Sequence, residues 1–274
     1  MSCVTDVLGH SVVGIEKEKR LSSYKLILLH APAGYGKTTL LVDVAQHTSV
    51  PCCWYHLDQT DTDRLTFLTT LLASLRQRFP SFGSTLDPLL TDNASQRANS
   101  RESANYFETL INTLVAALEQ EVPERFALFL CNYQEINDLP EMNSLVSLLL
   151  RKLSPRYLLV IESRVIPDLD FAQLLAGQMI FGLGTDQLRF SSQEIHELAR
   201  LLGVRSLSDA EANQLALNFE GWIAGILLGT RLSHLNTLPS FQRYVANPLF
   251  VEELEHQKRS QYLFSYVCLL YTSP

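Results

Sequence analysis

The sequence predicts an α/β protein built on a parallel sheet, and three observations support this fold class. Short apolar segments alternate with segments of helical periodicity up to about residue 184, which is typical of βαβ units. Residues 31–40 place two glycines and a Lys-Thr pair between the first predicted strand and the helix that follows. Only helical patterns follow Gly184. We therefore expect a sheet domain over residues 1–184 and a small helical domain over residues 185–240.

Five short apolar runs are the predicted strands, and helical patterns separate them. The strands are residues 25–30, 52–57, 126–130, 157–161 and 179–183. Helices are predicted from residue 40 and over residues 65–79, 106–118 and 145–153, because apolar residues there recur on one helical face. The stretch 80–101 contains Pro80, Gly83 and Pro88 among polar residues and is predicted to be an exposed loop. Further helices are expected over residues 192–202, 208–218 and 221–233.

Composition excludes several classes of function. The 274 residues are 46% hydrophobic and 19% charged, as in ordinary globular proteins. The net charge of −7 does not favour binding to a nucleic-acid backbone. No apolar run approaches the ~20 residues of a membrane span, and the N-terminus lacks the pattern of a secretion signal. Five scattered cysteines show no metal-binding spacing, so we expect reduced thiols in a cytoplasmic protein.

The segment after the first strand has the chemistry of a phosphate-binding loop. Glycines allow the backbone to curl so that successive amides point inward, and the start of the next helix adds partial positive charge. Lys37 is positioned to bind the β- and γ-phosphates, and the Thr38 hydroxyl to ligate Mg²⁺. Ala31 stands where the common pattern has its first glycine. The predicted nucleotide contacts are Ala33, Gly34, Tyr35, Gly36, Lys37, Thr38 and Thr39.

The third predicted strand lacks the acid that ATPases of this class carry at its carboxyl end. In such enzymes one acidic residue there holds Mg²⁺ through water, and a second often orients the attacking water. Here the two positions are Cys131 and Asn132, neither of which is charged at neutral pH. Glu135 is either a substitute for the missing acid or a solvated loop residue. We therefore expect nucleotide binding with slow or absent hydrolysis, so the chain is at most a slow ATPase.

Two other strand ends carry polar candidates. Arg164 follows the fourth strand and is predicted either to contact the γ-phosphate or to pair with Glu162 or Asp168 at the surface. Asp58, after the second strand, is expected to cap the next helix or a turn, in preference to a role near Mg²⁺. Trp54 and its neighbour Tyr55 are expected in the core.

Taken in order, these motifs resemble those of one family. Residues 31–40, the run 54–58, the run 132–134, the Ser163-Arg164 pair and the stretch 220–228 resemble the nucleotide-binding region of bacterial MalT/LuxR-type transcriptional regulators. These are STAND-class signal-transducing P-loop ATPases related to NB-ARC domains. The resemblance covers residues ~25 to ~230 in the right order and is therefore more specific than the P-loop alone.

The resemblance implies an ATP/ADP-dependent switch. In the family, ADP keeps the sheet, a helical lid and a winged helix closed, whereas inducer and ATP open them for self-association, and a C-terminal domain engages DNA. Carried over, residues 185–240 are the lid, and residues 241–274 are the start of a truncated winged helix. Lys37 and Thr38 hold phosphate and Mg²⁺, Arg164 senses the γ-phosphate, and the helix from Gly221 packs near the nucleotide. The family usually has Asp where this chain has Cys131.

Two other functions remain open from the sequence alone, because fold does not determine function. One is an ordinary P-loop enzyme, such as a small-molecule kinase or an active ATPase. The Cys131-Asn132 pair argues against it. The other is an interaction scaffold that no longer binds a nucleotide.

Overall fold

The computed structural model describes residues 24–91, 103–201 and 207–234. Its centre is a five-stranded parallel sheet with the order β2-β3-β4-β1-β5. All five predicted strands are confirmed, with ends shifted by one or two residues. They are β1 (Leu26–His30), β2 (Cys52–His56), β3 (Ala127–Cys131), β4 (Leu158–Ser163) and β5 (Ile180–Leu183).

Strand register brings the carboxyl ends of β1 and β4 together. Leu29 pairs with Glu162 and His30 with Ser163, while Leu130 of β3 pairs with Ile161 of β4. The chain leaves β1 for the distant β2, and every later connection steps back across the sheet. Such a reversal marks the edge at which α/β proteins place their ligands, outside the carboxyl ends of the strands. The ends of β1, β3 and β4 are therefore the strand ends that matter for the candidate site.

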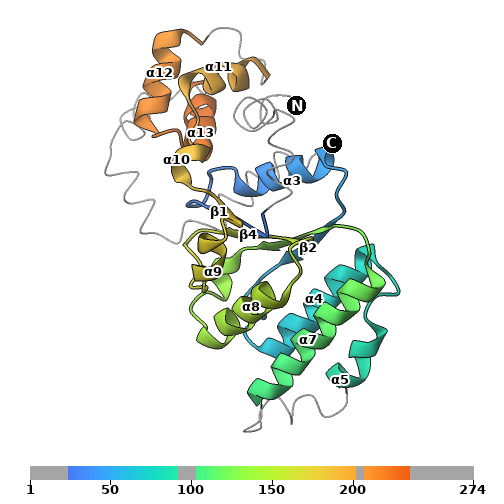
Figure 1. Ribbon diagram of the computed structural model, residues 1–274. Helices are drawn as coiled ribbons and strands as arrows, with labels where there is room; N and C mark the ends of the chain where they lie inside the picture. Colours follow the sequence, from blue (N-terminus) through green and yellow to red (C-terminus); the bar gives the residue numbers. More distant parts are fainter. Residues whose placement is uncertain (1–23, 92–102, 202–206, 235–274) are drawn as a thin grey trace. The chain divides into compact units, whose positions relative to one another are not determined.

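One face of the sheet forms the main hydrophobic core. Helices α4 (Arg64–Arg78), α7 (Ser103–Glu121), α8 (Pro140–Lys152) and α9 (Ala172–Ala176) lie on this side (Figure 1). Alternate strand residues point into it, including Leu128 and Leu130 of β3 and Leu159 and Ile161 of β4. Their neighbours Cys131 and Glu162 therefore belong to the opposite face of the sheet. Both are buried.

The predicted helices are present, and one predicted loop is wrong in part. Helix α3 (Lys37–His47) follows the glycine-containing loop, and α8 begins five residues earlier than predicted, at a proline suited to a first turn. Within the stretch predicted as a loop, η1 (Ser84–Leu86) and α5 (Asp87–Thr91) are helical. The turn η2 (Tyr133–Glu135) and the short helices α9 and α10 (Thr185–Leu188) were also not predicted.

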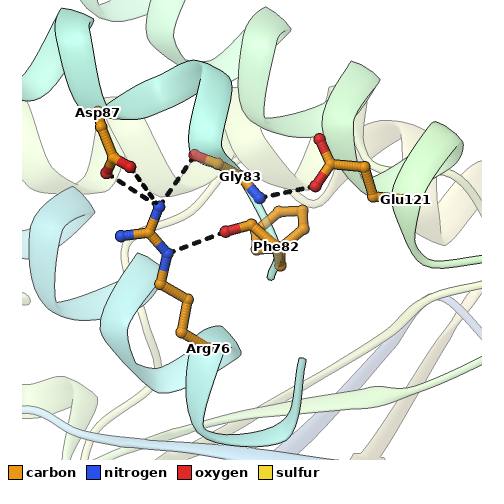
Figure 2. Close-up of polar contacts among 5 residues, drawn as sticks. All are labelled: Arg76, Phe82, Gly83, Asp87 and Glu121. Atoms are coloured by element: carbon orange, nitrogen blue, oxygen red, sulfur yellow. Dashed lines mark hydrogen bonds and ion pairs between the residues drawn. The ribbon is translucent and has the colours of Figure 1, made fainter. Parts of the chain in front are cut away.

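The turn between α4 and α5 is held by one arginine (Figure 2). Arg76 donates from Nε to the carbonyl of Phe82 at 2.9 Å and from Nη2 to the carbonyl of Gly83 at 3.1 Å. Its Nη2 atom also lies 2.9 Å from the Asp87 carboxylate. On the other side of the turn, the Gly83 amide donates to the Glu121 carboxylate of α7 at 2.8 Å. These contacts explain why a segment rich in Pro and Gly is ordered.

We expect Arg76→Ala to lower the free energy of unfolding by about 1–3 kcal/mol, because charged hydrogen bonds to two backbone carbonyls are lost. Chemical denaturation followed by circular dichroism measures this change. Arg78→Ala is the matched control, since Arg78 is exposed in the same helical turn, and it should change stability by less than about 0.5 kcal/mol. Equal losses in both variants would show that the turn does not depend on Arg76.

The second group of helices has a small core of its own. Helices α11 (Ser192–Leu201), α12 (Asp209–Asn218) and α13 (Ile223–His234) confirm the three predicted after Gly184. Ile195, Ala212 and Ile226, one from each helix, pack together. Ser191 and Glu194 form the predicted capping box at the start of α11: the Ser191 amide donates to the Glu194 carboxylate at 2.7 Å.

By its contacts, the chain divides into two compact units. Among the described residues, one unit contains the sheet with residues 24–30 and Leu41–Leu183, and the other contains Ala31–Leu40 with residues 184–234. The loop after β1 thus belongs with the helical unit. The winged helix expected over residues 241–274 lies outside the described residues. Within the described ranges, no helix is both long and apolar enough to cross a membrane, and no group of three or more His, Cys, Asp or Glu side chains could hold a metal ion.

Candidate nucleotide-binding site

The loop after β1 has the backbone conformation that phosphate binding requires. Gly34 and Gly36 have φ angles of 81° and 77°, in the left-handed region that glycine adopts without strain. Helix α3 then begins at Lys37, and the Leu40 amide donates to the Gly36 carbonyl at 2.9 Å. The strand, glycine loop and helix predicted for this segment are therefore confirmed.

The side chains of the loop and of the first turn of α3 differ in how deeply they are buried. Lys37 is buried, with only 6% of its surface exposed, and its Nζ donates to the Pro32 carbonyl at 3.1 Å, so its ammonium group is folded back over the loop. Thr38 is half-buried in the first turn of α3, and Thr39 is exposed. Burial raises the pKa of Tyr35, and the carboxylates of Glu220 and Asp186 raise it further against the opposing effect of Arg189.

Three successive backbone amides in this loop have no hydrogen-bond partner within the described part of the chain. Among the residues that the structure describes, none accepts a hydrogen bond from the amides of Gly34, Tyr35 or Gly36. Consecutive unpaired amides at a helix N-terminus form a concave anion site. With the ammonium of Lys37 and the hydroxyl of Thr38, this donor set fits a polyphosphate and its magnesium ion.

A second segment of the same unit contacts the loop from outside. The indole Nε1 of Trp222 donates to the Ala33 carbonyl at 2.9 Å, and the Ala224 amide donates to the Gly34 carbonyl at 3.1 Å. These residues belong to the Gly-Trp segment at the start of α13. Here Gly221 has a φ of 70°, and a Cβ atom on it would lie 2.7 Å from the Phe190 amide. The sequence resemblance implies that this helix packs near the nucleotide, but it does not identify these two hydrogen bonds.

Cys131 ends β3 where an acid was expected, and it carries no charge. The side chain is 1% exposed. Burial and then the neighbouring Glu162 carboxylate raise the pKa of the Cys131 thiol to about 12. Ionisation of this thiol cannot replace the missing carboxylate at neutral pH. Glu135 does not stand at the end of the strand either: it lies in η2, beside the side chain of Gln134.

We expect Cys131 to resist iodoacetamide at pH 8 in the folded protein, because a thiol with a pKa of about 12 holds roughly one thiolate in ten thousand. Peptide mass spectrometry measures the modification, and the half-buried Cys52 is the internal control. Equal rates at both cysteines would contradict the burial of Cys131. Since an unburied thiol ionises near pH 9.0, the protonated thiol stabilises the fold below that pH. This contribution is lost as the pH rises toward 12.

Glu162 is the functional candidate that sequence reasoning missed. It is 3% exposed and lies on the same sheet face as Cys131, one strand nearer to β1. Its Oε2 accepts a hydrogen bond from the Asn132 amide at 2.9 Å, at the tight turn where Asn132 has a φ of 61°. From the sequence, Glu162 was expected only as a possible ion-pair partner of Arg164 at the surface. Its place in an apolar strand, one residue before the strand ends, was the available signal.

Arg164 follows the end of β4, as predicted, and is half-buried. Its backbone amide donates to the Gln134 side chain at 3.1 Å, which fixes the chain direction after β4. Within the described part of the chain, its guanidinium forms no ion pair, so the predicted alternative of pairing with Glu162 or Asp168 is wrong. Arg164 belongs to the sheet unit.

The acidic residues after β2 have local structural roles. Asp58 accepts hydrogen bonds from the amide and hydroxyl of Thr60, which lower the pKa of its carboxyl. Asp61 accepts from the Tyr55 hydroxyl at 2.7 Å, and Asp63 caps α4. The capping or turn role preferred for this segment is confirmed. Tyr55 is buried as predicted, and the half-buried Trp54 stacks on Phe129.

The strand order, the loop after β1 and the helix that follows it together define a P-loop NTPase fold. A protein-family model described as Nephrocystin 3, N-terminal, matches residues 13–164, which is more than half of the chain. The chain belongs to this family.

Comparison with individual proteins gives a bacterial relative. The chain is 27% identical to the HTH-type transcriptional regulator MalT of Cronobacter sakazakii over 233 residues, which are 84% of this chain and 24% of MalT. The chain is thus an NTPase region related to that of MalT-like regulators, and it spans about a quarter of the length of that relative.

Two solved structures show weaker likeness. The Walker-type ATPase PABY2304 of Pyrococcus abyssi has a TM-score of 0.49 at 15% identity, over 88% of this chain and 73% of that one. The FIGL-1 AAA domain has a TM-score of 0.38 at 15% identity, over 81% and 62%. The fold class rests on the strand order and the family match.

Proposed function

We propose that this chain is the ATP/ADP-binding switch module of a transcriptional regulator. The observation that carries the proposal is the loop after β1. There, three amides that have no partner among the described residues, a buried lysine and a threonine form a phosphate cradle. The relationship to MalT, whose name describes a transcriptional regulator, supports the regulatory role.

In this proposal each residue of the site has a defined task. Amides of residues 33–39 and the ammonium of Lys37 bind the β- and γ-phosphates, and the Thr38 hydroxyl ligates Mg²⁺. Arg164 contacts the γ-phosphate and so distinguishes ATP from ADP, a role that the unpaired state of its guanidinium among the described residues supports. Magnesium, when bound, neutralises phosphate charge.

Hydrolysis is expected to be weak, because Cys131 is neutral where an acid is usual. We infer that Glu162 instead supplies negative charge at this edge of the sheet. The inference uses register alone: Glu162 pairs with Leu29, two residues before the loop begins. Glu162 can hold water bound to magnesium, but no second acid follows β3 directly to orient an attacking water.

We propose that the protein is cytoplasmic. Its proposed domains are a sheet domain over residues 1–184, a lid over residues 185–240 and a winged helix that begins at residue 241. The ATP state self-associates, and contact with DNA belongs to a domain outside this sequence.

Isothermal titration calorimetry with ADP and ATP, each with and without Mg²⁺, tests the proposal. We expect binding of both nucleotides and no phosphate release in the ordinary enzymatic range of ~1–10³ s⁻¹. Turnover in that range would instead indicate an active enzyme. If well-folded protein gives no heat with either nucleotide, the proposal fails and the alternative of an interaction scaffold is favoured.

A further inference from the structure

The P-loop of this protein is bound on its outer side by two donors from the lid segment. The indole of Trp222 donates to the Ala33 carbonyl at 2.9 Å, and the amide of Ala224 donates to the Gly34 carbonyl at 3.1 Å. Trp222 is 189 residues from Ala33 in sequence, yet the loop and α13 belong to the same compact unit. Two consecutive carbonyls of the phosphate loop are therefore fixed by one helix end.

The contact between the loop and α13 satisfies hydrogen-bonding groups of both segments. Trp222 directly precedes α13, and its carbonyl accepts from the Ile226 amide at 3.0 Å, so the Ala224 amide is among the first amides of the helix, which lack intrahelical partners. The Gly34 carbonyl supplies that partner. This approach requires glycine, because a Cβ atom on residue 34 would lie 2.4 Å from the Trp222 Nε1 and 2.7 Å from the Ala224 Cβ.

Because the peptide group is planar, these two hydrogen bonds also determine the direction in which two loop amides point. A trans peptide is planar, so its C=O and N–H bonds point in opposite directions, and the described chain contains no cis peptide. The Ala33 carbonyl shares its plane with the Gly34 amide, and the Gly34 carbonyl shares its plane with the Tyr35 amide. When the lid holds both carbonyls, both amides point away from α13. These are two of the three cradle amides that lack a partner in the described ranges.

We propose that Trp222 and Ala224 are positioning residues that orient the Gly34 and Tyr35 amides for phosphate, so that the lid and the nucleotide polyphosphate bind the P-loop cooperatively. The inference rests on the proposed nucleotide binding and deepens it. Because coupling between two binding events is reciprocal, whatever the lid contact adds to phosphate affinity, bound phosphate adds to the lid contact. The loop itself connects nucleotide occupancy to the lid.

Trp222→Phe tests the proposal, because phenylalanine keeps an aromatic ring but lacks the N–H donor, and the Trp54→Phe control makes the same change in ring size. Losing one oriented hydrogen bond should weaken ADP binding about fivefold to tenfold in calorimetry. Trp54→Phe is the matched control: it changes the only other tryptophan, which stacks on Phe129 of the sheet, and should leave ADP affinity within about twofold.

The outcomes separate the two proposals. If wild-type protein binds no ADP, the proposed function fails. If it binds ADP and Trp222→Phe binds equally well, the function stands and the lid inference is overturned. Weakening of equal size in both variants also overturns it, since the effect would then not depend on the loop contact.

A second measurement keeps the inference testable even if Trp222→Phe folds poorly. Hydrogen-exchange mass spectrometry of Trp54→Phe should show that saturating ADP slows exchange in residues 222–228. In the same variant Trp222 is the sole tryptophan, so ADP should also shift the fluorescence emission. Exchange and emission that stay unchanged at saturating ADP would contradict coupling between lid and phosphate.

Discussion

Replacing Lys37 with alanine is expected to abolish the stabilisation that ADP or ATP gives this protein. A ligand at ~100 times its Kd adds roughly 2.7 kcal/mol to the folded state, which thermal-shift measurements detect readily. The lysine is 6% exposed and its ammonium lies 3.1 Å from a carbonyl of the loop, so the charge is already placed at the cradle. Its removal leaves the phosphates without their cationic partner in the loop.

The control for this experiment is Lys152→Ala. Lys152 ends α8, is 41% exposed and pairs with Glu108, so its loss removes the same charge from the surface of the sheet unit. The nucleotide-induced shift should be unchanged in this variant. A shift that persists in Lys37→Ala, in protein that unfolds cooperatively, would move the nucleotide site away from the loop after β1.

Local sequence pattern was sufficient for the parts of this fold that depend on neighbouring residues. The strands are short apolar runs bounded by polar residues. The two glycines indicate the conformation of the loop, so β1, the P-loop and α3 can be predicted from residues 25–45 alone. Helix α11 was predicted at its start because Ser191 and Glu194 form a capping box within four residues.

Prediction failed where structure depends on distant partners. Helix α5 lies in a segment that reads as a loop, and it is ordered by the side chain of Arg76 and by Glu121 of a later helix. The bond from Trp222 to Ala33 joins residues that no local pattern relates. The sequence pattern indicated a surface position for Glu162. It is buried because β4 pairs with both β1 and β3.

Changing Glu162 to glutamine is expected to weaken the part of nucleotide affinity that depends on magnesium, because the proposed Thr38 ligand remains. Glutamine is close in shape and its carbonyl oxygen can still accept from the Asn132 amide, so the turn after β3 should persist. We expect Mg²⁺ to strengthen ATP binding to wild-type protein by about tenfold or more, equivalent to about 1.4 kcal/mol. In Glu162→Gln, the affinities that calorimetry gives with Mg²⁺ and with EDTA should differ by clearly less than in wild-type protein.

Two further variants decide whether the effect belongs to charge at this position. Glu135→Gln removes an acid from the neighbouring turn and should leave the magnesium dependence intact. Adding Cys131→Asp to Glu162→Gln returns one carboxylate to the same face of the sheet, one strand away, and should restore the dependence. Failure of that double variant to bind magnesium-ATP better than Glu162→Gln would show that charge on this face does not anchor the ion.

Cys131→Asp alone also tests whether a magnesium ion binds beside Glu162. It places two buried carboxylates side by side, and like charges at short distance raise each other's pKa and destabilise the fold unless a cation lies between them. We therefore expect its melting temperature to fall in EDTA and to recover with Mg²⁺ and ATP, by more than the shift that wild-type protein shows. A variant equally stable with and without the cation would mean that Glu162 faces no magnesium site, and the slow hydrolysis proposed for this chain would then need a different cause.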